Sequence, residues 1–114
     1  MAMEARERLL QEYITLAGKN PFAEWLHAIR DKTTRARIRT RLSRLRLGNF
    51  GDTRSVGEGV HELRLDFGPG YRLYYGLADE TIVLLLGGGD KRSQSRDIRE
   101  AKQHWQEFQD HHAH

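Results

Sequence analysis

The segment LRLDFGPGYRLYYG, residues 63–76, constrains the fold most, because it predicts two short strands around a tight turn. The central GPG supplies the turn, since glycine adopts positive φ and proline fixes φ. Side chains alternate across a strand with a period of two. If the apolar faces of the two arms coincide, Arg64, Arg72 and Tyr74 lie together on the opposite face. We expect that face to be the open side of a sheet.

The remaining apolar patterns predict an α+β chain. The expected elements begin with a first strand in LLQEYITLA (9–17) and a helix after Asn20. A second helix follows, which is capped by Thr33 or Thr34 and stopped at Gly48. After it come a strand near 53–56, the hairpin, a buried strand in TIVLLLGGG (81–89), and a last helix capped by Ser93 or Ser95. The two early helices are close enough in sequence to predict a helical hairpin. We therefore expect a small antiparallel β-sheet with an N-terminal helical hairpin and a C-terminal helix, all helices on one face.

The length of 114 residues predicts one domain spanning residues 1–114, with a frayed tail from about residue 110. The absence of cysteine excludes disulfides and thiolate zinc sites. No apolar run approaches the roughly 20 residues of a membrane span, and the N-terminus lacks the apolar core of a signal peptide. These features favour a cytoplasmic protein that does not enter a membrane.

Positive charge is concentrated between Arg30 and Arg46, where seven arginines and one lysine stand against one aspartate. A solvated helix face is the ordinary interpretation of such a block. Here the arginines have almost no acids at i±4 to neutralise them. Arginine is also the preferred side chain for bidentate phosphate contact. A polyanion or an acidic protein is therefore a candidate partner for this helix, with Arg37, Arg41 and Arg44 as expected RNA-binding residues.

No motif for a metal, a cofactor or a nucleophilic serine is visible, and GGGDK lacks the spacing of a phosphate-binding P-loop. What remains is a basic set with one aromatic neighbour: Arg64, Arg72, Tyr74, Lys91 and Arg92. Such a set either holds phosphates passively or stabilises the charge that develops on a phosphorane and protonates a leaving oxygen. Spacing does not separate these two roles. Glu62 shares the face of Arg64 and neutralises it or acts in catalysis.

Two runs resemble the RelE/ParE toxins of bacterial type II toxin–antitoxin systems. They are RLSRLRLGNFGDTRSVGEGVHELRLDFGPGYRLYYG and LLLGGGDKRSQSRDIREAKQHW. The resemblance is closest to the HigB-like branch called addiction module killer proteins. It extends over nearly the whole chain, and the pieces RLGNFGD, GPGYR and GGDK are specific only in combination.

The resemblance implies a RelE-like fold and a ribosome-dependent mRNA endoribonuclease that needs no metal or cofactor. In RelE-type toxins the ribose 2′-hydroxyl attacks the adjacent phosphate, assisted by basic residues. By position, Arg72 matches the best-marked catalytic arginine, Arg64 a basic residue on the preceding strand, and Lys91 or Arg92 the basic residue after the last strand. Arg64 and Lys91 are both candidates for activating the hydroxyl and protonating the leaving oxygen.

The chain departs from RelE in its C-terminal segment, where SQSRDIREA has no tyrosine to stack on the mRNA. Base stacking then depends on Tyr74 or is absent. The resemblance also implies partners, namely the ribosome, mRNA and a small antitoxin with a HigA-like helix-turn-helix. Two alternatives remain open at this stage. ParE relatives share the fold and poison DNA gyrase, and an inactive nucleic-acid-binding module would carry the same charges.

Overall fold

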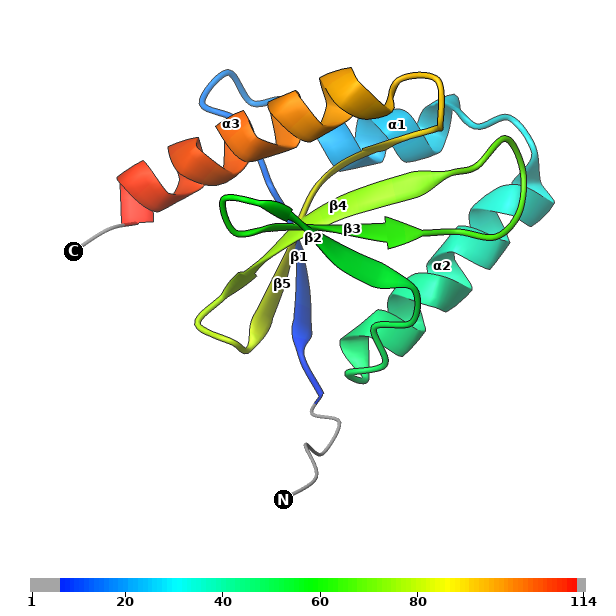
Figure 1. The fold of residues 1–114 in the computed structure, drawn as a ribbon, viewed down its shortest axis with the longest axis horizontal. Coiled ribbons are helices and arrows are strands. Elements are labelled where there is room, and N and C mark those ends of the chain that lie inside the picture. Colours follow the sequence, from blue (N-terminus) through cyan, green and yellow to red (C-terminus); the bar gives the residue numbers. More distant parts are fainter. Residues whose placement is uncertain (1–6, 113–114) are drawn as a thin grey trace.

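The computed structural model describes residues 7–112, which form three helices and one five-stranded sheet (Figure 1). The elements in chain order are β1 (Leu9–Glu12), α1 (Pro21–Ala28), α2 (Lys32–Arg46), β2 (Thr53–Gly57), β3 (Val60–Arg64), β4 (Arg72–Ala78), β5 (Ile82–Gly89) and α3 (Gln94–His112). The predicted α+β class and C-terminal helix are confirmed. Because α3 continues to His112, the tail expected to fray from about residue 110 is helical over 110–112. No helix within residues 7–112 is long and apolar enough to cross a membrane.

The sheet is mixed, so the prediction of an antiparallel sheet is wrong at one strand. Its strand order is β1-β5-β4-β3-β2, and β1 pairs with β5 in parallel while the other neighbours are antiparallel. The two helices after β1 carry the chain to the far edge of the sheet, where β2 begins. The four later strands then return by successive turns until β5 meets β1. The direction of β1 thus follows from this long connection and not from its local sequence.

The N-terminal region is a strand followed by two helices, which do not form a clear hairpin. Asn20 caps α1 as predicted, with its side chain accepting from the Ala23 N–H at 2.9 Å. Asp31 caps α2 in place of the expected Thr33 or Thr34, because its carboxylate accepts from both of those residues. Close backbone contacts join α1 to β5, whereas few join it to α2.

Helices cover both faces of the sheet, so the expectation that all helices lie on one face is wrong. A first core lies between the sheet and the helices α1 and α2, and includes Phe22, Leu26, Ile38, Leu42, Leu45, Leu63, Leu73 and Tyr75. A second core lies between the sheet and α3, and includes Tyr13, Val60, Tyr74, Leu84, Leu86, Ala101 and Trp105. Consecutive residues of β5 alternate between the two cores, which confirms the prediction that this strand is buried on both faces.

The contact between α3 and the sheet is close because the sheet carries a glycine at the crossing point. A Cβ atom at Gly76 would lie 2.4 Å from the ring of Trp105, so only glycine leaves room for the indole. One apolar stripe of α3 faces the sheet, since Ala101 and Trp105 are buried while Ile98 and Phe108 pack beside them. Burial of this stripe gives α3 its hydrophobic attachment to the sheet.

The predicted hairpin is formed by β3 and β4. Its turn relies on Gly68 and Gly70, which have φ values of 67° and 77° in the left-handed region that favours glycine. Leu63 lies directly opposite Leu73 in the register, so the apolar faces of the two arms coincide as expected. The polar residues of both arms consequently share the other face, which is the face that α3 partly covers.

Candidate functional site

Two rows of polar residues cross the central strands on the face toward α3. In the first row, Arg54 of β2 lies opposite Glu62 of β3, which lies opposite Tyr74 of β4. In the second row, Arg64 of β3 lies directly opposite Arg72 of β4. The sequence therefore predicted correctly that Arg64, Arg72 and Tyr74 share a face.

Glu62 is the centre of the first row. Its side chain is fully buried and accepts three hydrogen bonds. Arg54 Nε donates to Oε1 at 3.0 Å, while the Tyr74 hydroxyl and Gln94 Nε2 donate to Oε2 at 3.1 and 2.8 Å. Because Gln94 is the first residue of α3, this carboxylate ties three strands and the last helix together.

The arginines of the second row also face the Glu62 carboxylate. Arg72 Nε lies 3.7 Å from Oε2, and Arg64 Nε lies 3.9 Å from Oε1. Together with Arg54, three guanidinium groups surround one buried carboxylate, which leaves an excess of positive charge. The pairing of Glu62 with Arg64, one of its two expected roles, is thus present but is shared with two other arginines.

The pKa values of two buried groups in the cluster, the Glu62 carboxyl and the Tyr74 phenol, are shifted in opposite directions. Burial raises the pKa of Glu62, but hydrogen bonds from Gln94, Arg54 and Tyr74 lower it by more, so its pKa lies below the ordinary value. Burial and the charge of Glu62 raise the pKa of Tyr74 well above its ordinary value. At neutral pH the carboxylate is therefore ionised, and the phenol keeps the proton that it donates to it.

Tyr74 does not lie on an open surface, and the expectation that it stacks on an RNA base is wrong. Its side chain is fully buried in the core beneath α3. No local pattern predicts this cover, because the apolar stripe of α3 does not reveal which face of the sheet the helix meets.

The two predicted catalytic arginines differ in exposure. The side chain of Arg64 is 47% exposed, whereas that of Arg72 is 10% exposed. Arg72 is held by its Nη1, which donates to the Gly70 carbonyl at 2.8 Å, and its buried Nε has no hydrogen-bond partner among residues 7–112. Arg72 is therefore a nearly fixed charge at the base of the site, and Arg64 is the accessible one.

Lys91 and Arg92 follow β5 and are exposed. Lys91 lies beside Arg72, because Lys91 Cβ and Arg72 Nη1 are both 3.3 Å from the place that a Cβ on Gly70 would occupy. Arg92 belongs to a turn in which the Asp90 carboxylate accepts from the Arg92 N–H at 2.8 Å and the Ser93 N–H at 3.2 Å. The structure thus brings the start of the Lys91 side chain close to Arg72.

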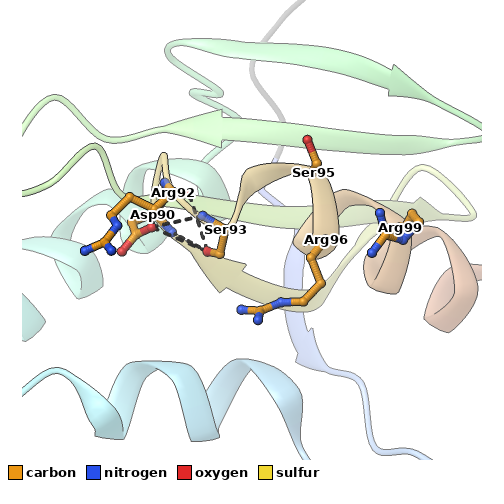
Figure 2. Close-up of a pocket in the computed structure, with 6 residues that line it drawn as sticks. All are labelled: Asp90, Arg92, Ser93, Ser95, Arg96 and Arg99. Carbon is orange, nitrogen blue, oxygen red and sulfur yellow. Dashed lines mark hydrogen bonds between the residues drawn. The ribbon is translucent and has the colours of Figure 1, made fainter.

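Figure 2 shows an open depression at the start of α3, which further arginines line. Its lining residues are Asp90, Arg92, Ser93, Ser95, Arg96 and Arg99. Sequence reasoning missed Arg96 and Arg99, although their spacing from Arg92 places all three near one end of the helix. It also missed Arg54, whose position on the predicted strand 53–56 was the available signal, and Gln94, for which no local signal exists.

The arginines of α2 lie apart from this cluster, on the helix that covers the opposite face of the sheet. The Arg37 guanidinium lies 4.1 Å from the centre of the Phe67 ring, which is a cation–π contact. Arg41 is half-buried against Gly51, and Arg44 is exposed. The structure therefore does not bring Arg37, Arg41 and Arg44 to Arg64 and Arg72.

Histidine and acidic side chains do not gather as metal ligands would anywhere in residues 7–112. The side chains that dominate the candidate site are guanidinium and ammonium groups, which bind oxyanions and not metal ions.

Comparison with known proteins identifies one informative relative. An uncharacterized protein of Haemophilus influenzae is 46% identical over 81 residues, which cover 71% of this chain and 82% of that protein. No family model matches the chain. No solved structure matches it either.

Proposed function

This chain belongs to the same protein family as the uncharacterized Haemophilus influenzae protein, and we propose that it is a HigB-like toxin of the RelE/ParE superfamily with a RelE-like fold. In this proposal it is a cytoplasmic, ribosome-dependent mRNA endoribonuclease that acts without a metal or other cofactor. Its partners are the ribosome, mRNA and a HigA-like antitoxin that neutralises it.

The observation that carries the proposal is the pairing of Arg64 and Arg72 directly opposite each other, with Lys91 alongside. Like charges opposite each other on a sheet are destabilising. The Glu62 carboxylate supplies one negative charge for the three guanidinium groups of Arg54, Arg64 and Arg72, so the pair keeps an excess of positive charge that favours a bound oxyanion. A phosphodiester is the oxyanion that arginine recognises most readily in nucleic acids.

In the proposed reaction the ribose 2′-oxygen attacks the adjacent phosphorus and the bond to the 5′-oxygen breaks. The products are a 2′,3′-cyclic phosphate and a 5′-hydroxyl, so the 2′-hydroxyl loses one proton and the leaving oxygen gains one. Arg64 and Lys91 are the accessible groups for these transfers and for contact with the phosphate. Arg72 contributes a fixed positive charge, which costs no reorganisation as negative charge develops on the phosphorane.

Glu62 is not the base in this scheme. Its carboxylate is fully buried, and both of its oxygens already accept hydrogen bonds. A general base must reach the proton that it removes. Proton transfer is therefore assigned to the basic residues, and Tyr74, which is buried, has no role in base stacking.

The proposal is tested with Arg64→Ala and Arg72→Ala in a purified translation reaction, with Lys19→Ala as a control that removes an exposed cation elsewhere. Loss of one fixed charge aimed at the transition state lowers the rate by about 10²–10³-fold. We expect losses of this size in mRNA cleavage for both site variants, with normal far-UV circular dichroism. Intact mRNA with the wild-type protein, together with DNA cleaved by gyrase, would assign the chain to the ParE type.

A further inference from the structure

We propose that Glu62 is a positioning residue, whose buried carboxylate fixes the guanidinium groups of Arg64 and Arg72 in the orientation that the substrate phosphate meets. This inference rests on the proposed function, because it concerns the same site. In this role Glu62 does more than neutralise Arg64, and it does not act as a general base.

The geometry places Glu62 where it can act on both arginines. It lies two residues before Arg64 on the same strand face, and each of its oxygens faces the Nε of a different arginine of the pair. Its two oxygens are therefore divided between Arg64 on one strand and Arg72 on the next. Without the carboxylate, two arginines at directly opposite positions of the sheet would have no opposite charge between them.

The carboxylate is itself held from three directions. Tyr74 and Gln94 both donate to Oε2, and Arg54 donates to Oε1. A group with complete burial and three donors has little freedom to rotate, so it transmits a defined geometry to the arginines. Gln94 matters most for a test, because it is only half-buried and can be changed without emptying the core.

The arrangement also explains why Arg72 keeps a buried Nε without a hydrogen bond. The Nε is 3.7 Å from Glu62 Oε2, so it is compensated by charge and not by a direct bond. The Nη1 bond to Gly70 fixes the other side of the same guanidinium. Arg72 is thus oriented by two groups, and loss of the carboxylate would leave only one.

The experiment compares wild type, Glu62→Gln, Gln94→Ala and the control Glu58→Gln. Glu58→Gln removes the same charge from an exposed position in the turn between β2 and β3. The first measurement is the NMR order parameter of the Nε–H groups of Arg64 and Arg72. We expect a high Nε–H order parameter for Arg72 and a lower one for the more exposed Arg64 in wild type, and we expect both to fall in Glu62→Gln. Gln94→Ala should lie between wild type and Glu62→Gln, and Glu58→Gln should match wild type.

The second measurement is the kinetics of mRNA cleavage on programmed ribosomes. Misplacement of a catalytic group by about 1 Å costs about 10²-fold in rate. We expect kcat to fall by about that factor in Glu62→Gln and less in Gln94→Ala, with KM unchanged. A purely structural role would lower the amount of folded protein and leave the kcat of each folded molecule unchanged.

Unchanged order of both arginines in Glu62→Gln overturns the inference, and so does lost order with wild-type kcat. If Glu62→Gln does not fold, Gln94→Ala decides by the same two criteria. If the wild-type protein cleaves no mRNA, the proposed function fails. The NMR order then still decides whether Glu62 positions the arginines, so the two failures are distinguishable.

Discussion

At the scale of single residues, the ionisation of Glu62 decides the electrostatics of the site. A buried carboxylate is unfavourable unless donors and cations surround it, and here the donors lower its pKa despite the burial. Asp97 shows the opposite result nearby, because burial raises its pKa by more than the Ser93 hydroxyl lowers it. The number of donors, and not burial alone, therefore sets the direction in which each pKa is shifted.

The lowered pKa of Glu62 predicts a pH dependence of stability. The folded state binds this proton more weakly than the unfolded state, so the contribution of Glu62 is fully present above the unfolded pKa of about 4.3. It is lost as pH falls through the lower folded pKa. We expect Glu62→Gln to lose roughly 2–3 kcal/mol of unfolding free energy at pH 7.

The difference in unfolding free energy between wild type and Glu62→Gln should shrink steadily as the pH falls below about 4.3. Urea unfolding of both proteins between pH 3 and 7 measures it, since the contribution of Asp97 cancels in the comparison. A difference that is constant over this range would contradict the assignment of an ionised Glu62.

At the scale of elements, local patterns predicted most of the structure. The GPG turn, the Asn20 cap and the apolar run of β5 each have a local physical cause, and each was found where expected. The parallel pairing of β1 and the placement of α3 over Glu62 and Tyr74 have no local cause. They depend on which faces meet after the chain has crossed the sheet, and this is why the open face was predicted wrongly.

The helix α2 gives a prediction of its own. Arg39 and Arg44 are exposed, so Arg39→Glu with Arg44→Glu changes charge without disturbing the contacts of Arg37 and Arg41. If α2 contacts ribosomal phosphates, the affinity for ribosomes should fall and the slope of log affinity against log salt should become shallower by about 1–2.

Arg39→Lys with Arg44→Lys keeps the charge and serves as the matched control. Cleavage of already bound mRNA should be unchanged in both pairs, because α2 lies on the other face of the sheet from Glu62. An unaltered salt slope in the glutamate pair would instead assign this helix to the antitoxin or to solvent.

At the scale of the whole molecule, cations lie on both layers that cover the sheet. The arginines of α2 belong to one layer, and Arg92, Arg96 and Arg99 belong to the start of α3 on the other. Arg64, Arg72 and Lys91 lie between them, where β3 and β5 end and β4 begins. A small basic protein of this design can contact a polyanion on several sides while one cluster acts on a single phosphate.

The central claim is that this cluster cleaves mRNA through the 2′-hydroxyl, and the ends of the product test it most directly. Purified protein would be added to ribosomes on a defined mRNA, and the new ends would be identified chemically. The proposed mechanism yields a 5′-hydroxyl and a 2′,3′-cyclic phosphate, with no cleavage when the nucleotide at the cut carries a 2′-O-methyl group. A 5′-phosphate, or cleavage that survives 2′-O-methylation, would contradict it.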